Sequence, residues 1–282
     1  MRSNRRLGTG PGFTVDAVTC ADDHQGWSQA EVGDDYRLVL VRSGRFGRMT
    51  DGVAGLVDPT MAYLGLPGEE ERFAHPAGGD VCTALSLSPA LWRSLTGERQ
   101  GRLSPTVYVD ARVELAHRTF LRATKGGDAG FALAESMLGL LGTVLGQASP
   151  TVDAAAAAQV MSAPRASEVR RRLVSEAREA IIADHPAAEG LISLAQLLGA
   201  SPYALSRAFT REMGVSLTHY RNRVRVGRAL ERLEGGVASL AELAVELGFA
   251  DQAHLTRTIR SHLGHTPTAL RRLLSGRSAD DR

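Results

Sequence analysis

The chain has 282 residues, 43% hydrophobic and 23% charged; this length suits two domains, and the composition excludes a wholly disordered chain. Its net charge of +2 hides an asymmetry, because residues 165–282 carry 18 Arg and no Lys against 13 acidic residues, whereas residues 1–164 are net acidic. No apolar run of about 18 residues is present and none follows the N-terminal arginines, so we expect neither a membrane span nor a secretory signal. With two cysteines, too few for a disulfide scaffold, the sequence predicts a cytoplasmic protein.

Residues 13–87 have the pattern of short β-strands. Apolar or alternating runs are separated by Gly, Asp and Pro pairs that favour tight turns. The runs cover residues 36–41, 53–57, 61–66 and 81–87. This pattern predicts a small β barrel or sandwich.

After residue 88 the apolar period becomes helical, with helices predicted at 90–95, 111–123 and 130–145. The last is too apolar for a helix that faces water, so it either forms a dimer contact or packs on its own barrel. Residues 1–147 are therefore the first domain and residues 148–167 a linker. Residues 168–275 form an all-helical domain, with helices at 168–183, 191–198, 202–213, 217–233, 240–247, 252–263 and 267–274. Residues 276–282 are a flexible tail.

An internal repeat lies inside the helical domain. Leu194, Ala195, Leu198 and Gly199 recur 49 residues later, and the seven matching positions from Ser201 to Ser216 recur 50 residues later. Each copy has a short helix, a glycine turn, a capping Ser or Asp, and a second helix with a buried apolar stripe. The sequence therefore predicts two helix-turn-helix units. The helix at 217–233 links them, and its arginines either meet phosphates or form ion pairs.

The outward faces of the two second helices are rich in hydrogen-bond donors and nearly free of acid. An α-helix fits the DNA major groove, where Arg can bond guanine and Gln can bond adenine. Ordinary solvated helix faces are the alternative, which the matched Arg207 and Arg257 disfavour. The candidate DNA-binding residues are Tyr203, Ser206, Arg207, Thr210, Arg211, Gln252, His254, Thr256, Arg257 and Arg260.

Residues 191–272 resemble the AraC/XylS family of transcription regulators. The resemblance rests on positions that include Ala195, Ser201-Pro202, Leu205-Ser206-Arg207, Phe209, Gly214, Tyr220, Arg225, Ala229, Ala244, Gly248-Phe249, Arg257, Gly264, Pro267 and Arg271. The chain departs from the family's usual aromatics at Leu255, Ile259 and Leu270, which remain apolar, and from its usual Lys at Arg260. The resemblance implies that the outward side chains of both units face base edges or phosphates.

The first half is similar, more weakly, to the cupin-like sensor domains of that family. The fold expected is therefore α+β with two domains: a cupin-like β barrel with trailing helices, then an all-α domain with two helix-turn-helix units joined by a linker helix. The resemblance implies double-stranded DNA as partner, RNA polymerase as a further partner, a homodimer formed through the N-terminal domain helices, and a small-molecule effector. Candidates for the effector pocket are Trp27, Arg42, Tyr63 and Trp92.

The first half also contains a possible metal-binding set. Cys20 and His24 are four residues apart, and His75 and Cys82 are seven apart. Two Cys and two His can form a closed tetrahedral zinc site if the strands bring the pairs together. The alternative is two buried cysteines and two surface histidines, and no cofactor is required by the predicted function.

The function predicted is a sequence-specific DNA-binding transcription regulator and not an enzyme. It would read two successive major-groove segments and associate with the nucleoid when bound. A cupin-type metal-dependent enzyme fused to a helical module is the alternative, disfavoured because the barrel region holds only two histidines, His24 and His75. Operator, effector and the direction of regulation do not follow from the sequence.

Overall fold

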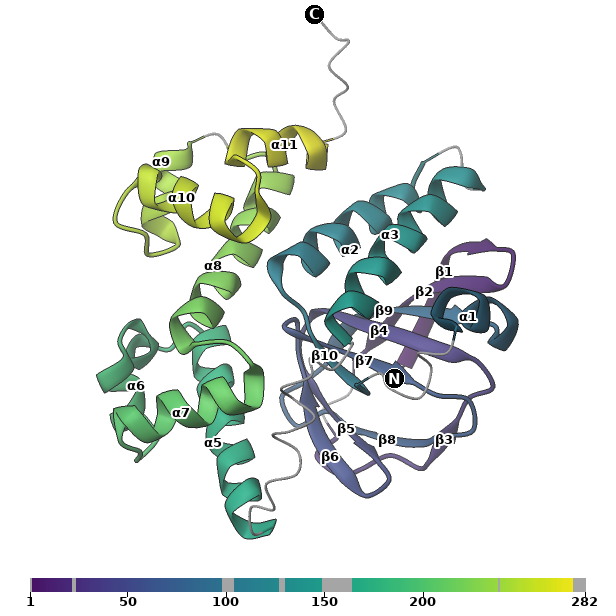
Figure 1. The fold of residues 1–282 in the computed structure, drawn as a ribbon, viewed down its shortest axis with the longest axis horizontal. Helices are drawn as coiled ribbons and strands as arrows, with labels where there is room; N and C mark the ends of the chain where they lie inside the picture. The colour runs from purple at the N-terminus through teal and green to yellow at the C-terminus, as the bar shows by residue number, and fades with distance from the viewer. Residues whose placement is uncertain are drawn as a thin grey trace, which may run out of the picture. The chain divides into compact units, whose positions relative to one another are not determined.

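The computed structural model describes residues 2–21, 24–97, 104–126, 130–148, 164–237 and 239–275. The chain divides into two compact units, Met1–Ala156 and Ala157–Arg282, called here the barrel unit and the helical unit (Figure 1). The division falls within the predicted linker at 148–167. Most of that linker, and the predicted tail at 276–282, lie outside the described residues.

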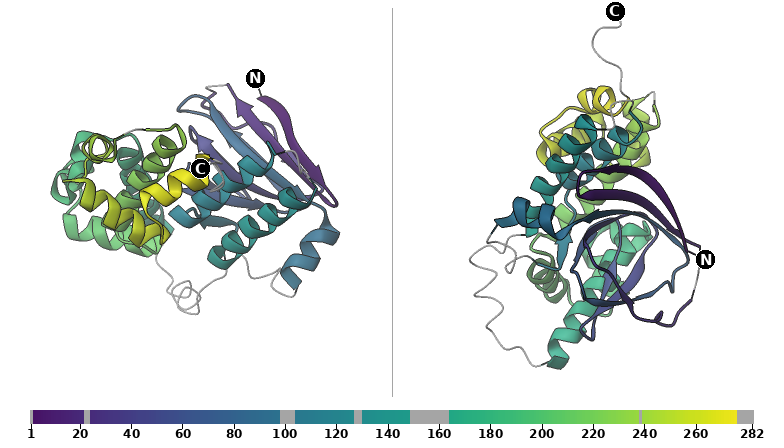
Figure 2. Two further views of the ribbon diagram at one scale, coloured as in Figure 1. Left: turned by 90° about the horizontal axis from the view of Figure 1, so that it is seen from above. Right: turned by 90° about the vertical axis from the view of Figure 1, so that its right-hand side faces the viewer.

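The barrel unit is built from two antiparallel sheets. A six-stranded sheet has the order β1-β2-β9-β4-β7-β10, and a four-stranded sheet has the order β3-β8-β5-β6. The right-hand view of Figure 2 shows the strands curving around the barrel interior. The strands are β1 (Arg2–Gly10), β2 (Phe13–Cys20), β3 (Glu31–Val32), β4 (Tyr36–Ser43), β5 (Phe46–Thr50), β6 (Val53–Val57), β7 (Met61–Gly65), β8 (Glu70–Ala74), β9 (Asp80–Leu87) and β10 (Thr106–Tyr108).

The central strands of the six-stranded sheet contribute to two cores, one on each face, because alternate residues of a strand point to opposite sides. On β4, Leu38 and Leu40 belong to a core shared with helices, whereas Val39 and Val41 belong to a second core that also contains Phe46 of the four-stranded sheet. The period-two pattern in the sequence therefore fixes which residues line the barrel interior.

Three helices follow the strands: α1 (Pro89–Thr96), α2 (Ala111–Ala123) and α3 (Phe131–Ala148). They cover the outer face of the six-stranded sheet (Figure 1). By length and composition alone α3 could cross a membrane, but six of its residues, Leu140 and Val144 among them, are buried in this core. The buried face of α3 thus packs on its own barrel, which is one of the two alternatives that the sequence left open.

The helical unit consists of helices connected by short turns. Its elements are α5 (Pro164–Ile182), the 3-10 turn η2 (Pro186–Glu189), α6 (Leu191–Leu197), α7 (Pro202–Met213), α8 (Leu217–Glu234), α9 (Leu240–Glu246), α10 (Gln252–Leu263) and α11 (Pro267–Ser275). The predicted fold class, an α+β barrel domain followed by an all-α domain, is confirmed. The predicted runs correspond to β4, β6, β7 and β9. Strands β2, β3, β5 and β8 lie within the strand-like region but were not delimited, and β1 and β10 lie outside it. The start of α5 was placed four residues too late.

Candidate functional site

The first helix-turn-helix unit is formed by α6 and α7. Gly199 adopts a left-handed backbone with φ of 62°, which a side chain would strain, and so permits the tight turn. The Ser201 side chain accepts a hydrogen bond from the backbone N–H of Ala204 at 3.1 Å and caps α7. Leu205 and Phe209 are fully buried, so the opposite face of α7 is directed to solvent.

The second unit, formed by α9 and α10, repeats this construction. Gly248 has φ of 71° in its turn, and a Cβ there would also lie 2.6 Å from a guanidinium nitrogen of Arg225. The Asp251 carboxylate accepts from the backbone N–H of His254 at 2.6 Å and caps α10. Leu255 and Ile259 are fully buried, which confirms the predicted apolar stripe.

Helix α8 joins the two units, which lie at its two ends (Figure 1). Its 18 residues span about 27 Å at 1.5 Å per residue. Of its five arginines, Arg232 pairs with Glu246 at 3.0 Å, and three more lie against the rest of the unit. Arg223 is buried, Arg225 lies over the Phe249 ring at 5.4 Å, and Arg228 donates to the carbonyl of Ile182 at 3.0 Å. Arg228 also forms an ion pair with Asp184 at 3.0 Å, and phosphate contacts of the α8 arginines stay a prediction.

The solvent face of α7 carries the predicted residues of the first unit. Tyr203 is 70% exposed, and Arg207, Thr210 and Arg211 are exposed as well, whereas Ser206 is half-buried. An Arg207 guanidinium nitrogen donates to the Tyr203 hydroxyl at 3.1 Å. Its carbon lies 5.4 Å from the centre of that ring. The pair therefore presents a cation and an aromatic ring side by side on the helix surface.

The first unit also borders α5. A shallow groove between α5 and α7 is lined by Val169, Leu173, Arg207 and Arg211 among others. Arg170 of α5 forms an ion pair with Glu212 of α7. The face of α7 is thus flanked along one side by a second basic helix.

The solvent face of α10 is simpler. Gln252, Arg257 and Arg260 are exposed, and His254 and Thr256 are half-buried. The His254 ring packs edge-on against Phe249 at 5.2 Å between ring centres, and its Nδ1 accepts from the backbone N–H of Ala250 at 3.5 Å. These contacts hold the imidazole in place next to the first turn of the helix.

Together the two faces have the chemistry of a reader of duplex DNA. Each helix exposes at least two guanidinium groups, which can bond guanine edges bidentately or phosphates. Both helices end at a left-handed glycine, Gly214 or Gly264, with φ of 71° and 73°, so the two copies share the same local geometry.

The barrel unit contains a cavity of about 360 Å³. Of the four residues predicted for an effector pocket, Tyr63 lines it. The other three lie elsewhere: Trp92 is buried in the helix-side core, stacked on Tyr36, and Trp27 and Arg42 are exposed. Residue type alone selected these candidates, and they are separated by their place in the fold: Tyr63 is on β7, whereas Trp92 is on α1 and Trp27 lies between β2 and β3.

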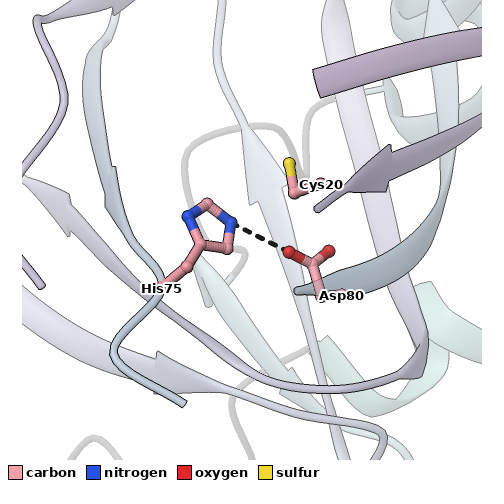
Figure 3. A group of neighbouring side chains, drawn as sticks. All are labelled: Cys20, His75 and Asp80. Atoms are coloured by element: carbon pink, nitrogen blue, oxygen red, sulfur yellow. Dashed lines mark ion pairs between the residues drawn. The ribbon is translucent and has the colours of Figure 1, made fainter. Parts of the chain in front are cut away.

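The predicted metal-binding residues gather at this cavity, and a residue that the sequence did not single out lies among them. Cys20, His24, His75 and Cys82 all line the cavity, together with Asp80. Side-chain ligand atoms of Cys20, His75 and Asp80 lie within 4.8 Å of one another (Figure 3). The spacing of Asp80 and Cys82, two apart on one strand, was the available signal, since it puts both on the same face.

Glycine permits this close approach. A Cβ at Gly79 would lie 2.2 Å from the carbonyl oxygen of Cys20, so only glycine lets the end of β2 meet the start of β9 here. The backbone N–H of His75 donates to the carbonyl of His24 at 2.9 Å, and their rings lie 4.9 Å apart. His24 is itself exposed.

The thiols of this cluster are held in their protonated form. Burial, and next the Asp80 carboxylate, raise the pKa of Cys82 and of Cys20. The Cys82 thiol donates to Asp80 Oδ2 at 2.8 Å. Burial also lowers the pKa of His75, against the opposing influence of Asp80. Reactive cysteines have lowered pKa values, so the cluster is not built as an exposed thiolate nucleophile.

With the geometry of both units described, the chain can be compared with known proteins. Residues 194–273 match the family model described as a helix-turn-helix domain. This stretch contains most of α6 and all of α7 to α10. This stretch is therefore similar to that helix-turn-helix family, and it contains both of the units that the sequence predicted.

Curated relatives match in the same region. The chain is 37% identical over 65 residues to the HTH-type transcriptional regulator YbfI of Bacillus subtilis, covering 23% of each protein. It is 35% identical over 75 residues to the transcriptional activator RhrA of Rhizobium meliloti, covering 26% of this chain and 24% of RhrA. The matches thus span about a quarter of the length of these relatives.

Among solved structures, ToxT from Vibrio cholerae overlaps 94% of this chain and 100% of its own, with 11% identity and a TM-score of 0.36.

Proposed function

We propose that this protein is a sequence-specific DNA-binding transcription regulator that inserts α7 and α10 into successive segments of the major groove. The observation that carries the proposal is the repeated unit itself: two recognition helices with the same caps and core expose Arg207 and Arg257 at equivalent positions. Relatives that share this domain are named as transcription regulators. A cupin-type enzyme, the alternative, has no comparable support.

The barrel unit supplies the control in this proposal. Its cavity of about 360 Å³ falls within the size range of small-molecule sites, and an effector bound there would change how the two readers are presented. Helix α3 exposes Phe131 and Leu138, which supports a homodimer contact through the barrel-unit helices. RhrA is named an activator, so RNA polymerase is a further proposed partner. The protein would act at the nucleoid, in the cytoplasm.

The test uses the full chain and duplexes selected from a random pool. Binding is measured by fluorescence anisotropy at several salt concentrations, and affinity is expected to fall steeply as salt rises, because phosphate contacts release counterions. Arg207→Ala and Arg257→Ala should each weaken binding to the selected site by about 1–3 kcal/mol, roughly 5- to 150-fold.

The matched control is Arg172→Ala. It removes the same charge from an exposed helix position on α5, where Arg172 pairs with Glu176 at 2.8 Å, and it should leave specific affinity nearly unchanged. Absence of binding to any duplex at low salt would falsify the proposal. Equal losses in Arg172→Ala and Arg257→Ala would instead show that net charge, not the α10 face, determines affinity.

A further inference from the structure

The cluster at the mouth of the barrel cavity has the donor set and the geometry of a metal centre. It is drawn together from three places in the fold: Cys20 ends β2, His75 directly follows β8, and Asp80 begins β9. Their ligand atoms, one thiol sulfur, one ring nitrogen and one carboxylate oxygen, converge within 4.8 Å (Figure 3). Because each residue lies at or next to the end of a strand, the sheet backbone holds the three ligand atoms in position.

A fourth donor stands beside these three. The register of β2 with β9 pairs Cys20 with Asp80 and Val18 with Cys82, so both cysteines and the carboxylate lie on one face of the sheet. Cys82 is 3% exposed, and its sulfur lies 2.8 Å from Asp80 Oδ2. A thiol proton now occupies the contact that a metal ion would take.

Two buried polar atoms of the cluster make no hydrogen bond. His75 Nδ1 and Asp80 Oδ1 are buried without a hydrogen-bond partner among the described residues, although Asp80 Oδ1 lies 2.8 Å from His75 Nε2. A cation that lines the same cavity, Arg2, is paired with Glu31 at 2.6 Å. Unpaired buried polar groups are costly, and a divalent cation bound between His75 Nε2 and Asp80 Oδ1 would give that carboxylate oxygen a partner.

We propose that Cys20, His75, Asp80 and Cys82 bind one Zn²⁺ ion. Thiolate and imidazole ligands select zinc over the hard cations, which prefer oxygen ligands alone. Binding releases the thiol protons to solvent, and the two thiolates and the carboxylate surround the ion with His75 as the neutral ligand. His24 lies beside the site but is not a ligand.

Four protein ligands close a tetrahedron and leave no position for a substrate, which makes the site structural or regulatory and not catalytic. The ion would tie the end of β2 to the start of β9 and to the segment after β8. Because these residues also line the cavity, zinc occupancy would set the shape of one cavity wall.

A disulfide between the two cysteines is the competing chemistry. Diagonal cross-strand neighbours have Cα atoms about 7–8 Å apart, beyond the roughly 6.8 Å that a disulfide spans. The register therefore favours a bridging ion over an S–S bond.

The experiment measures zinc in the full chain, purified under reducing conditions without chelator or affinity tag. We expect about one zinc ion per chain by mass spectrometry of the metal. Replacement by Co²⁺ should give thiolate-to-cobalt charge-transfer absorption, which reports this site alone because the chain has two cysteines, Cys20 and Cys82. Zinc should also protect both thiols of the native protein from alkylation.

Variants separate the ligands from their neighbour. Since outer-shell changes alone cost about 10- to 100-fold in metal affinity, Cys20→Ser and Asp80→Asn should each weaken zinc binding by at least about 100-fold. Cys82→Ser should reduce the cobalt charge-transfer band by roughly half, one of two thiolates being lost. The matched control, His24→Ala, should change affinity by less than about tenfold.

Three results would overturn the proposal. One is a wild-type chain that is metal-free and gives no thiolate-to-cobalt band. Another is an intramolecular disulfide in the reduced-purified protein. The third is a loss of zinc affinity in His24→Ala as large as that in Asp80→Asn, which would mean that His24 is a ligand and that the proposed ligand set is wrong. The wild-type spectrum and alkylation test do not depend on any variant folding.

Discussion

Among the described residues, the barrel unit buries nine polar or charged side chains, whereas the helical unit buries three, Arg178, Arg223 and Thr258. Both units bury a full apolar core, so the difference does not come from size. In the barrel, buried charges are paired across strands: Glu71, fully buried, is bonded by Arg48 at 2.7 Å and forms an ion pair with Arg37. In the helical unit the charged residues lie mainly on helix faces.

This difference indicates what each unit is built to recognise. Buried polar groups are retained at a cost in desolvation. Two of the nine, His75 and Asp80, line the cavity in the barrel, where they can contact a small ligand or an ion. Exposed arginines such as Arg257 remain hydrated, so folding carries little desolvation cost for them, and their charge remains available to a large polyanion. This contrast agrees with the proposed roles, in which the barrel unit would bind a small ligand or ion and the helical unit would bind DNA.

The largest expected effect tests whether the two cores are independent. Phe209→Ala removes a fully buried ring that contacts Tyr220 at 5.1 Å, and should lower the free energy of unfolding of the helical unit by about 3–5 kcal/mol. Calorimetry should show the helical transition shifted and the barrel transition unchanged. The matched control Ile192→Ala, at a position of α6 that is 65% exposed, should change stability by less than about 0.5 kcal/mol. A shift of both transitions in Phe209→Ala would mean that the units unfold as one.

The next effect concerns a buried histidine that sequence analysis did not single out. His117 of α2 is buried against the sheet, its Nε2 lying 2.9 Å from Thr83 Oγ1. Burial, and then the positive charge of Arg42, lower the pKa of His117 to about 3, while Glu114 opposes and Arg118 reinforces the shift. The neutral ring is thus the form that the barrel accommodates.

The sign of the pH dependence follows from this lowered pKa. As the pH falls, His117 of the unfolded chain is protonated near its ordinary pKa of about 6.5, whereas in the folded chain it stays neutral to a lower pH. The contribution of neutral His117 to the free energy of unfolding is therefore fully present above about pH 6.5 and is lost as the pH falls toward 3. Between about pH 7 and about pH 4 the loss should be on the order of 3 kcal/mol. His117→Gln, followed by urea denaturation at each pH, should flatten that part of the profile. His265→Gln, at an exposed position of the helical unit, should keep the wild-type slope.

The sequence predicted the helical unit more completely than the barrel unit. The repeat located the helices from α6 to α11 because glycine turns, capping residues and apolar stripes of period 3.6 all agree there. For example, the predicted boundaries of α7 and α10 coincide with the observed ones. The recognition faces followed from the same periodicity, and their DNA contacts remain predictions.

In the barrel unit the local signals were weaker. Strand β1 has mostly exposed residues and lies at the edge of its sheet, where charged side chains are common and no apolar alternation marks the strand. Asp80 reads as the end of a glycine turn, yet it begins β9 and faces Cys20 across the sheet. Which strands are neighbours is a long-range property. The sequence could therefore not show that β2 and β9 pair and bring the proposed metal ligands together.

The smallest effect compares the two reader units directly. Ser201 and Asp251 fill the same capping position, and each accepts one backbone N–H, at 3.1 Å and 2.6 Å. Ser201→Ala and Asp251→Ala should each lower the stability of the helical unit by about 1 kcal/mol, because a helix N–H then loses its partner. Ser261→Ala, an exposed position inside α10, should instead be neutral or slightly stabilising, since alanine favours helix. If Asp251→Ala costs clearly more than Ser201→Ala in thermal denaturation and the excess disappears at high salt, the carboxylate also stabilises α10 through the helix dipole. The second reader would then be held by a charge that the first lacks.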